Sequence, residues 1–560
     1  MVKRVRVAAT VAAILVCTTG PPAVAADSNW TSAGQNLSNT RYQSTEKRIG
    51  VGTVGQLART WTFQAGGEVS ATPAVDGSKV YFPDWAGNLF AVDRSTGRQV
   101  WKASIAAASG VPGDKARATP AIAGGKLIIG TQGVFGAGGG GKVLAFDKDT
   151  GALLWSTRLD SHRAAVITQS ATVYDGRVLV GTSSVEESLA AFIPGYPCCT
   201  FRGVMAALDV DTGAVLWKTV MVPEGFPGGA VWGSSPAVDP ARGLLYIATG
   251  NNYDVPQATL ECIDLAGDDI DHQRACIPAD NHIDSVLALD VATGAIRWAT
   301  QALPFDAWTV QCLFGFNPQN CPEPAGPDYD FGQAPALFSV RDSRGKAHDV
   351  VGAGQKSGQY WVLDRDSGAE LRVTVAGPGG TAGGLQWGSA LDASRIYTAN
   401  ANSDLKNWPP PDGPTTGVWS GIDQSTGELL WQTRPPHGGG TSGPATTANG
   451  VVFGCALDAD GYMYALDGAT GQVLWEFASG GSCLSGAAIS RGQVFWGSGY
   501  TNLGPPLTTN NELHAFAITS PAAMPGAPSA NASRTAFSLA VSTSLTQSPG
   551  AFSRINIIFV

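Results

Sequence analysis

One phrase recurs seven times along the chain and constrains its fold more than any other feature. A short apolar run is followed by Asp, two residues, Thr-Gly, three residues and Trp, as in AVDRSTGRQVW, which ends at Trp101. Later copies end at Trp155, Trp217, Trp298, Trp431 and Trp475, and a degenerate copy, VLDRDSGAELR, ends at Arg372. Repeats at this kind of interval are typical of architectures in which each copy is one supersecondary unit that packs against its neighbours.

The chemistry of the phrase predicts a pair of β-strands. Thr-Gly suits a tight hairpin turn, and the Asp side chain can cap that turn. The Trp that follows is expected to lie between neighbouring sheets and to tie one unit to the next. The shorter alternating stretches between copies, such as 178–184, 244–250 and 451–457, supply further strands. We therefore predict an all-β fold, a β-propeller with radial repeats.

The two ends of the repeat region predict an eighth blade. LHAFAI at 513–518 ends without its Trp, and RTWTF at 59–63 provides an orphan Trp61. Joining these segments in one sheet would remove the open edge of the ring. Eight blades are therefore expected, with seven as the alternative. A solenoid is the rival architecture, but it would not need a blade built from both ends of the chain.

Composition excludes several functional classes. Only 14% of the 560 residues are charged, the formal net charge is −9, and Gly and Pro number 71 and 34. Because no basic face can be assembled from such a chain, nucleic-acid binding is not expected. No stretch reaches the length of apolar sequence that a membrane span needs. Thr519 to Val560 is rich in Ser, Ala and Pro and matches no repeat, so residues 521–560 are expected to form a disordered tail.

The first residues predict export. Lys3, Arg4 and Arg6 precede an apolar run over 7–16, and Ala23-Val24-Ala25 offers a small-x-small cleavage site. This pattern indicates a signal peptide over 1–25, with a core too short to cross a bilayer. The expected domain organisation is a signal peptide at 1–25, a propeller at 28–520 and the tail at 521–560. The protein is expected to be secreted or periplasmic.

Because the protein is expected to be exported to an oxidising compartment, its cysteines are predicted to form disulfides. Eight of the nine remain after the signal peptide is removed, and no C-x-x-C-H motif for covalent haem is present. Metal binding is the weaker alternative because no C-x-x-C pair exists. Proximity in the sequence favours Cys198–Cys199, Cys262–Cys276, Cys312–Cys321 and Cys455–Cys483.

The Trp-ended repeat resembles that of the pyrroloquinoline quinone (PQQ) dependent alcohol dehydrogenases over about 28–518. NWTSAGQNLSNTRYQ at 29–43 also resembles the N-terminal segment of that family. The segments containing YPCC, VWGSSP and DFGQAP are most similar to the polyvinyl-alcohol-dehydrogenase-like subgroup. Propellers with such repeats also occur in non-enzymatic assembly scaffolds, so the loops above the blades decide the function.

The resemblance implies a set of cofactor-binding residues. In the family, a Thr-Gln-small segment is followed fifteen residues later by a Ser-x-x-Glu loop, and TQS at 168–170 and SSVE at 183–186 keep that interval. Trp232 is placed to stack on the quinone and Lys356 to polarise its carbonyls. The full implied set is Arg117, Thr168, Ser183, Ser184, Trp232, Lys356, Gln386 and Trp387.

The resemblance also implies a metal site and a catalytic base. Glu186 and Asn251 occupy the positions of two metal ligands, and PDYDFG at 327–332 resembles the segment that carries the base. Asp328 is assigned as the base and as a ligand, Asp330 as a possible extra ligand, and Asp306 is the alternative base. Hard oxygen donors of this kind suit Ca²⁺, with a lanthanide as the other candidate.

The implied activity is the oxidation of alcohols, among them secondary alcohols or polyvinyl alcohol, by hydride transfer to PQQ. The metal would act as a Lewis acid and Asp328 would take the alcohol proton. An external acceptor such as a cytochrome would then receive the electrons. Two departures stand against the match, because Ser70 replaces a Glu of the family and the vicinal cysteine pair lies in an insertion. The alternative function is a non-catalytic propeller that scaffolds partners or binds a ligand.

Overall fold

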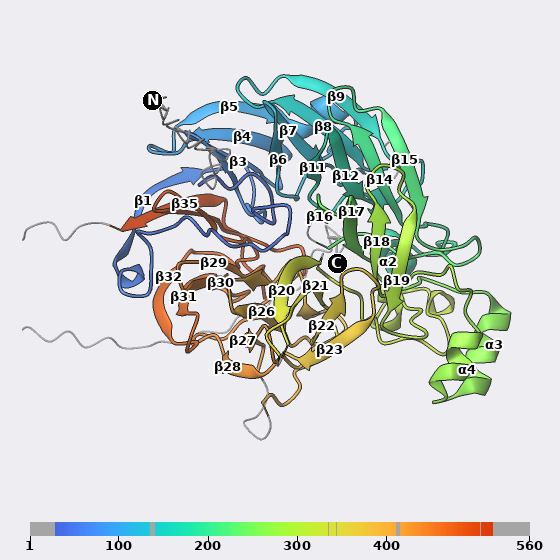
Figure 1. Ribbon diagram of the computed structural model, residues 1–560. Helices are drawn as coiled ribbons and strands as arrows, with labels where there is room; N and C mark the ends of the chain where they lie inside the picture. Colours follow the sequence, from blue (N-terminus) through green and yellow to red (C-terminus); the bar gives the residue numbers. More distant parts are fainter. Residues whose placement is uncertain are drawn as a thin grey trace, which may run out of the picture.

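The computed structural model describes residues 28–518, apart from 135–139, 234, 334, 343, 410–414 and 505. Eight antiparallel sheets are arranged around a common axis, so the fold is the predicted eight-bladed β-propeller (Figure 1). The predicted signal peptide at 1–25 and tail at 521–560 lie outside the described residues. Among the described residues, no helix combines the length and the apolar character that crossing a bilayer requires.

The first four blades follow one another along the chain, each with its strands in sequence order. The first blade consists of β2 (Ala74–Asp76), β3 (Lys79–Pro83), β4 (Asn88–Asp93) and β5 (Gln99–Ser104), and the second of β6 (Ala121–Ala123), β7 (Lys126–Gly130), β8 (Lys142–Asp147) and β9 (Leu153–Arg158). The third blade consists of β11 (Thr172–Tyr174), β12 (Arg177–Gly181), β14 (Val204–Asp209) and β15 (Val215–Val220). The fourth consists of β16 (Ala237–Asp239), β17 (Leu244–Ala248), β18 (Ser285–Asp290) and β19 (Ile296–Gln301).

The next three blades repeat this order, and the sixth carries two short inner strands. The fifth blade consists of β20 (Ala336–Arg341), β21 (Ala347–Gly354), β22 (Gln359–Asp364) and β23 (Glu370–Val375). The sixth consists of β24 (Gly384–Leu385), β25 (Ala390–Leu391), β26 (Arg395–Ala401), β27 (Gly417–Asp423) and β28 (Leu429–Thr433). The seventh consists of β29 (Thr446–Ala448), β30 (Val451–Cys455), β31 (Tyr462–Asp467) and β32 (Val473–Ala478).

The eighth blade closes the ring with strands from both ends of the chain. It consists of β33 (Ala488–Ser490), β34 (Gln493–Gly497), β35 (Glu512–Ile518) and β1 (Leu57–Gln64). β1 pairs antiparallel with β35, with Arg59 opposite Phe516 and Trp61 opposite Ala515. The split blade predicted from the orphan Trp61 is therefore confirmed.

The repeated Trp joins each blade to the next through a hydrogen bond and a close contact. The indole of Trp155 donates to the carbonyl of Val210 in the next blade at 3.1 Å. The Gly of that next repeat, Gly213, has a positive φ of 72°, and a Cβ placed there would lie 2.6 Å from the Trp155 ring. The glycine is therefore required twice, by its backbone conformation and by the indole that lies against it.

The Asp of each repeat holds the turn. Asp209 Oδ1 accepts hydrogen bonds from the backbone of Asp211 and from both the backbone and the hydroxyl of Thr212. The same arrangement recurs at Asp93, Asp147, Asp290 and Asp364. In the degenerate copy, the guanidinium of Arg372 replaces the indole and donates to the carbonyls of Gln424 and Ser425. The function of the repeat is therefore kept where its Trp is lost.

A segment before the first blade crosses the inner ends of the blades. Residues 28–43 exchange backbone hydrogen bonds with Val75, Ile122, Val238, Leu337, Leu391 and Thr447, all on innermost strands. The side chain of Asn39 donates to the carbonyls of Ser235 and Pro335, and Gln43 donates to the carbonyl of Ile489. We call residues 28–43 the axial segment. It links seven of the eight blades across the ring.

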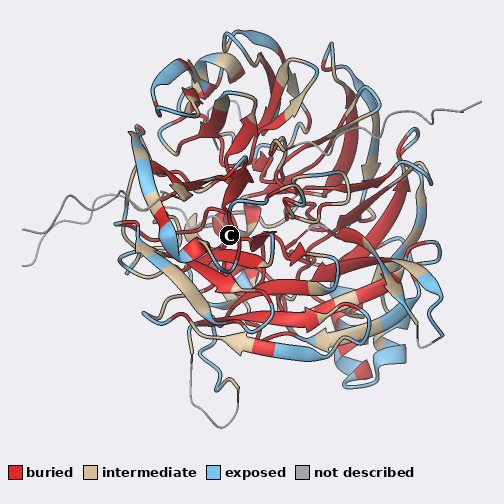
Figure 2. Cartoon of the chain, turned by 60° about the vertical axis from the view of Figure 1, so that its left-hand side comes forward, coloured by how far each residue is buried: buried red, intermediate tan, exposed pale blue. Residues whose placement is uncertain are grey.

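Burial follows the strand order within each blade, as Figure 2 shows. Inner and middle strands such as β3 and β8 are almost wholly buried, whereas outer strands such as β9 and β15 consist mainly of exposed and partly buried residues. The apolar core therefore lies between blades.

Short helices lie in the loops, mainly around the third, fourth and fifth blades. They are α1 (Ile105–Ser109), α2 (Glu186–Phe192), α3 (Gln257–Ala266) and α4 (Ile270–Ala275), with 3-10 turns η1 (Val54–Gln56), η2 (Val310–Cys312) and η3 (Pro318–Asn320). α3 and α4 stand out from the ring beside β19 (Figure 1). A two-stranded sheet of β10 (Ala165–Val166) and β13 (Ser183–Ser184) leads into α2.

All four expected cysteine pairs are disulfide-bonded. Cys198–Cys199 follows α2, Cys262–Cys276 ties α3 to α4, Cys312–Cys321 closes the loop after β19, and Cys455–Cys483 links the seventh blade to the eighth. Three of the four thus stabilise the loops on one side of the ring.

Candidate active site

Three small cavities adjoin one another among the loops at the inner ends of the blades. The first has a volume of about 50 Å³, and the other two about 20 Å³ each. Trp387 lines the first and the second, and Trp232 lines the second and the third, so the two indoles form the partitions between them. Every residue that the sequence predicted to bind a cofactor lines at least one of the three: Arg117, Thr168, Ser183, Ser184, Trp232, Lys356, Gln386 and Trp387.

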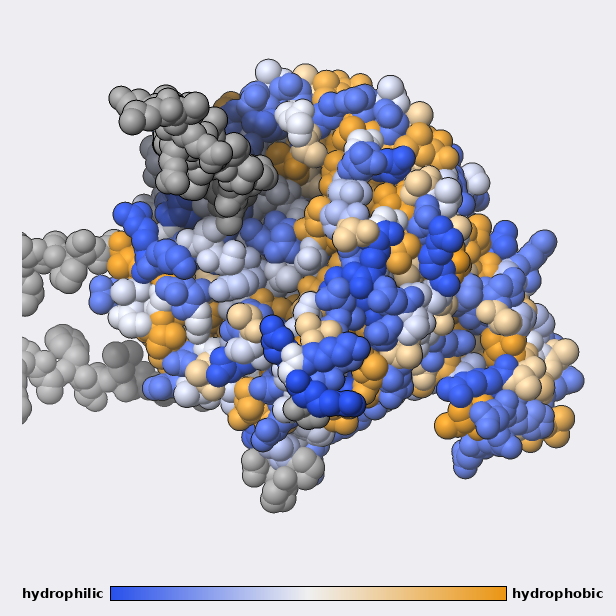
Figure 3. Space-filling model, in the orientation of Figure 1, coloured by the Kyte–Doolittle hydropathy of each residue, from blue (hydrophilic) through white to orange (hydrophobic). Residues whose placement is uncertain are grey.

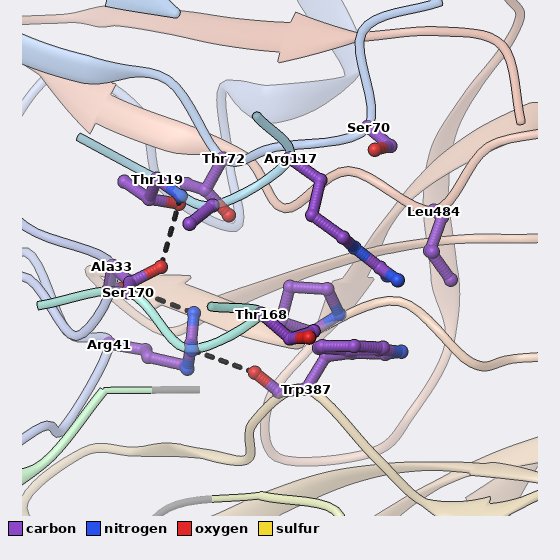
Figure 4. Close-up of a pocket in the computed structure, with 12 residues that line it drawn as sticks. Ala33, Arg41, Ser70, Thr72, Arg117, Thr119, Thr168, Ser170, Trp387 and Leu484 are labelled. Carbon is purple, nitrogen blue, oxygen red and sulfur yellow. Dashed lines mark hydrogen bonds between the residues drawn. The ribbon is translucent and has the colours of Figure 1, made fainter. Parts of the chain in front are cut away.

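The first cavity is lined by a buried arginine and hydroxyl groups. The guanidinium of Arg117 lies over the ring of Trp387, with its central carbon 4.3 Å from the ring centroid (Figure 4). Thr168 and Ser70 line the same cavity, and Ser70 accepts a hydrogen bond from the indole of Trp85. A fixed cation beside small hydroxyls suits the binding of a carboxylate. Ser70 stands where the family that the sequence resembles has a Glu, so this side of the cavity carries a hydroxyl in place of a carboxylate.

A second arginine sets the position of Trp387. Arg41, in the axial segment, donates to the carbonyls of Ala33 and Trp387 at 2.9 and 2.7 Å (Figure 4). Its burial lowers the pKa to about 10. Trp387 has a positive φ of 62°, and its ring meets that of Trp232 edge-on at a centroid distance of 5.2 Å. The axial segment thus reaches the site and supports one of its aromatic walls.

The third cavity contains the charged centre of the site. Lys356 Nζ lies 2.9 Å from Asp328 Oδ1 and 3.2 Å from Asp330 Oδ2, and its side chain is 2% exposed. Trp232 donates its indole N–H to Asp330 Oδ2 at 2.9 Å. Asp328 Oδ2 is buried and has no hydrogen-bond partner among the described residues. Burial raises the pKa of Asp328 well above its usual value, and Lys356 opposes that shift.

Asp306 anchors the loop that carries Asp328 and Asp330 through hydrogen bonds to the backbone of that loop. Asp306 accepts the backbone N–H groups of Asp328 and Tyr329 at 3.0 and 2.7 Å. Burial raises the pKa of Asp306 to about 7, although the hydrogen bond from Tyr329 opposes the shift. Because both Asp306 oxygens face the backbone of this loop, the alternative base lies behind the candidate base and positions it.

The side chains of Glu186 and its neighbour Glu187 contact different parts of the protein. The Glu186 carboxylate accepts hydrogen bonds from the Tyr196 hydroxyl and from the backbone of Thr200 and Phe201. It therefore anchors the loop around the vicinal disulfide. Glu187 instead lines the third cavity together with Asp330 and Lys356. Burial and the negative charge of Asp330 raise the pKa of Glu187 to about 8.

Sequence reasoning overlooked Glu187 because the Ser-x-x-Glu pattern occurs twice in overlapping register. Ser183 precedes Glu186 by three residues and Ser184 precedes Glu187 by three. The fifteen-residue interval from Thr168 favoured the first register, whereas the structure turns the second towards the charged centre. The overlapping pattern itself was the feature that could have revealed Glu187.

Asn251 lies next to the charged centre. Its backbone N–H donates to Asp330 Oδ1 at 2.8 Å, and its side-chain nitrogen donates to the carbonyls of Asn252 and Trp308. These two bonds fix the amide and turn its oxygen away from those carbonyls. Asn251, Asp328 and Asp330 thus lie together, and Glu187 lines the same cavity as Asp330, whereas the Glu186 carboxylate accepts hydrogen bonds from the loop at 196–201.

A further buried acid was not anticipated from the sequence. Asp284 is fully buried, and neither of its carboxyl oxygens has a hydrogen-bond partner among the described residues. Burial, reinforced by Asp306 and Asp330, raises its pKa well above the usual value. The region therefore concentrates acidic groups around the single ammonium of Lys356.

The vicinal disulfide borders this region without lining the three cavities. Cys199 packs against the apolar cluster of Ala165, Phe201, Ala230, Trp232 and Tyr253. Tyr253 in turn lines the third cavity and receives a hydrogen bond from Ser184 at 3.4 Å. One layer of side chains therefore separates the disulfide from the charged centre.

The donors present suit a hard cation and an aromatic, anionic cofactor. Carboxylates and an amide oxygen are the ligands that Ca²⁺ and similar ions prefer. The unpartnered Asp328 Oδ2 and the excess of carboxyls over ammonium groups both call for additional positive charge. The indoles and Arg117 supply apolar walls and a carboxylate partner. A multi-ring cofactor is larger than any one of the three cavities, so it would have to displace an indole that separates them.

The chain matches one family model and is similar in sequence to several dehydrogenases. The family model described as outer membrane protein assembly factor BamB matches residues 51–300 and 356–504. The chain is similar to the polyvinylalcohol dehydrogenase of Sphingopyxis sp. (strain 113P3), with 30% identity over 86% of this chain and 75% of the relative. It is also similar to a polyvinylalcohol dehydrogenase from a Pseudomonas species, with 28% identity over 84% of this chain and 73% of the relative.

Among solved structures, the fold resembles that of the quinohemoprotein alcohol dehydrogenase from Comamonas testosteroni. The TM-score is 0.65 at 19% identity, over 89% of this chain and 82% of that one. At this identity, the likeness concerns the propeller itself.

Proposed function

Because this chain belongs to the family of PQQ-dependent alcohol dehydrogenases with Trp-ended propeller repeats, we propose that it oxidises alcohols to carbonyl compounds. The expected substrates are secondary alcohols, including the hydroxyl groups of polyvinyl alcohol, which is named for two relatives. Electrons would leave to an external acceptor such as a cytochrome. Four disulfides support action in an oxidising compartment, outside the cytoplasm.

One observation carries the proposal. All eight residues expected to bind the cofactor line three adjoining cavities, and the candidate base lies at the ammonium of Lys356 beside the third. These residues come from distant parts of the sequence, and a propeller used only as a scaffold would not need to gather them. In this arrangement, Arg117 and Thr168 would hold a carboxylate of PQQ, Trp232 would support its ring, and Lys356 would face its carbonyls.

The proposed metal ligands are Glu187, Asn251, Asp328 and Asp330. Three carboxylates and one amide oxygen form a hard donor set with a formal charge of −3, and Lys356 is the cation that pairs with two of these carboxylates. Ca²⁺ suits such donors, and a trivalent lanthanide would neutralise the carboxylates more completely. When bound, PQQ supplies the two-electron acceptor and the cation supplies Lewis acidity at its carbonyl.

The protein's own contribution is to orient the base and to control its proton. Lys356 fixes Asp328 through Oδ1, so Oδ2 remains as the atom that can take the proton of the alcohol hydroxyl. Asp306 holds the backbone of Asp328 and so sets the direction of that oxygen. Burial raises the pKa of Asp328, and the ammonium of Lys356 opposes that rise, so Lys356 and a bound cation would together favour the ionised carboxylate that a base needs.

Reconstitution tests the proposal. We expect purified protein to reduce an artificial dye with secondary alcohols only when PQQ and either Ca²⁺ or a lanthanide are both added. Quenching of tryptophan fluorescence by PQQ provides a readout that does not depend on turnover, because Trp232 and Trp387 line the site. Absence of both quenching and dye reduction with either metal would favour the alternative, a propeller that binds partners without catalysis.

A further inference from the structure

Two surface hollows adjoin outside the candidate active site and share Gln257, the first residue of α3. Their volumes are about 540 and 730 Å³. We call them together the outer groove. The first hollow is lined by Cys199, Thr200, Arg202, Glu224, Gly225, Pro227, Asp254, Val255, Pro256 and Gln257. The second is lined by Gln257, Leu260, Glu261, Asp264, Pro318, Cys321, Pro322, Glu323, Pro324 and Ala325.

The walls of the outer groove continue directly from the loops of the charged centre. Asp254 follows Asn251 by three residues, and Ala325 precedes Asp328 by three. Consecutive α-carbons are about 3.8 Å apart, so each wall begins within about 11 Å of a proposed ligand. The third wall, at Thr200, is held by Glu186, the neighbour of Glu187. The lining of the groove is therefore continuous along the chain with the loops that carry the proposed ligands.

The groove is built from stiffened elements. The disulfide Cys262–Cys276 fixes α3 to α4, and Cys312–Cys321 closes the loop that supplies the opposite wall. The inner side of α3 is anchored by Leu260 and Ile263, which pack in one apolar cluster with Phe226, Val255, Phe305 and Ala307. A binding surface that is ordered in advance loses less conformational entropy when a flexible ligand binds. Figure 3 shows the α3–α4 region projecting from the body of the molecule.

The lining contains both hydrogen-bonding groups and small apolar surfaces. Five carboxyl groups accept hydrogen bonds, Gln257 and Thr200 can both donate and accept, and Arg202 is the one Lys or Arg in the lining. The apolar surfaces are Leu260, Val255, Ala325 and the rings of five prolines: Pro227, Pro256, Pro318, Pro322 and Pro324. Such a surface repels anionic chains, and it offers acceptors for the hydroxyls and apolar contacts for the methylenes of a neutral polyhydroxylated chain.

We propose that the outer groove binds a segment of a neutral polyhydroxylated polymer while one of its carbinol carbons reaches the charged centre. This inference rests on the proposed alcohol oxidation and adds a binding site for the polymer. A single small alcohol would leave most of a groove of this size unfilled, whereas a chain can occupy both hollows and pass Gln257 between them. A polymer with many equivalent hydroxyls also gains from a groove beside the site, because release of one unit leaves others nearby.

Kinetics of the reconstituted enzyme test the proposal through Gln257. This side chain is exposed at the junction of the two hollows, so Gln257→Trp should obstruct a chain without touching the charged centre. We expect KM for polyvinyl alcohol to rise about tenfold or more, while kcat/KM for a small secondary alcohol changes by less than about twofold. The matched control is Gln99→Trp, at an exposed position of β5 in the first blade, which should change neither value.

Binding to the cofactor-free full chain gives a second readout, measured by calorimetry with polyvinyl alcohol and with polylysine. We expect the wild type and Gln99→Trp to bind polyvinyl alcohol with little dependence on salt, and Gln257→Trp to bind it about tenfold more weakly. Tight, salt-sensitive binding of polylysine without binding of polyvinyl alcohol would overturn the proposal and indicate a basic protein partner.

The kinetic outcomes separate the two proposals. An enzyme that oxidises the small alcohol but has the same KM for polymer in wild type and Gln257→Trp refutes the groove and leaves the alcohol dehydrogenase intact. Failure to oxidise any alcohol, with polymer binding still lost in Gln257→Trp, refutes the activity and keeps the groove.

Discussion

Two adjacent glutamates have different tasks, although the sequence gives them the same motif. Glu186 is 1% exposed and its oxygens are satisfied by the loop at 196–201, whereas Glu187 lines the cavity beside Asp330. A carboxylate that already accepts backbone hydrogen bonds is poorly placed to bind a cation as well. The proposed metal site therefore depends on one register of an overlapping pattern.

Exchange of each glutamate for glutamine separates these tasks. We expect Glu187→Gln to weaken metal binding by about tenfold or more and to reduce turnover accordingly, because the charge of the donor set falls. Glu186→Gln should retain metal affinity but lower the free energy of unfolding by about 1–3 kcal/mol, since charge-assisted bonds to Thr200 and Phe201 are weakened. Metal titration and thermal unfolding check both. The reverse pattern would assign the metal to Glu186.

The proposed base can be tested in the same way. Asp328→Asn keeps the size of the side chain and an oxygen that can coordinate, but it cannot accept the alcohol proton. We expect turnover to fall by about a thousandfold or more, with a much smaller effect on PQQ affinity. Dye reduction and fluorescence quenching measure the two separately. If Asp328→Asn retains wild-type turnover, Asp306 becomes the candidate.

Burial of the acids should make the cofactor-free protein more stable near pH 5 than near pH 8. Glu187 has a pKa of about 8 and Asp306 of about 7, both raised by burial, whereas unfolding returns them to their usual values near 4. Between about pH 5 and 8, the folded state therefore holds protons that the unfolded state has released, so stability falls as pH rises. Thermal unfolding across this range should show the decline, and a bound cation should flatten it. A melting temperature that instead rises from pH 5 to 8 would contradict the raised pKa values.

At the scale of elements, the Trp-ended phrase predicted the architecture because its parts are needed in every copy. Asp closes the turn, Gly leaves room for the indole, and Trp, or Arg372 in the degenerate copy, donates to carbonyls of the next blade, so each position of the phrase has a packing role. The orphan Trp61 and the strand at 513–518 without its Trp together predicted the split blade. The helices α3 and α4 and the pair β10–β13 follow no repeat, so the outer groove could not be foreseen.

The docking of Gly against Trp can be measured with two glycines of similar backbone conformation. Gly213 and Gly176 have φ values of 72° and 71°, but an added Cβ meets the Trp155 ring only at Gly213 and open space at Gly176. Gly176→Ala should cost about 1 kcal/mol from backbone strain, and Gly213→Ala about 2–4 kcal/mol because the indole must also move. Denaturant unfolding of both variants gives the difference. Equal losses would show that the contact contributes nothing beyond the backbone.

At the scale of the whole molecule, the axial segment connects the ring to the site. Asn39 bonds to the fourth and fifth blades, Gln43 to the eighth, and Arg41 to the backbone of Trp387. The resemblance at 29–43 indicated that this segment belonged to the fold. It did not indicate which blades the segment contacts, because the segment bonds to backbone carbonyls, which every residue type possesses. Its contribution should therefore extend beyond its own residues.

Asn39 tests that contribution. Asn39→Gly keeps the left-handed backbone (φ 57°) and removes the amide that joins Ser235 and Pro335. We expect a loss of about 2–4 kcal/mol in the free energy of unfolding, because two buried carbonyls and a hydroxyl lose partners. The control is Asn36→Gly, whose side chain bonds only nearby exposed groups and should cost about 1 kcal/mol or less. Equal effects would confine the segment to a local role.

The closure of the ring by β1 and β35 has a consequence for the order in which the chain can fold. The hydrogen bond from Thr60 to Ala515 joins residues 455 positions apart, so β1 emerges during synthesis long before its partner exists. Until then, one edge of β1 is open, and such edges promote association between chains. A polypeptide that stops before Glu512 cannot form β35 and leaves β34 unpaired on one side as well. Incomplete chains should therefore aggregate, and productive folding has to wait for β35, the last described strand.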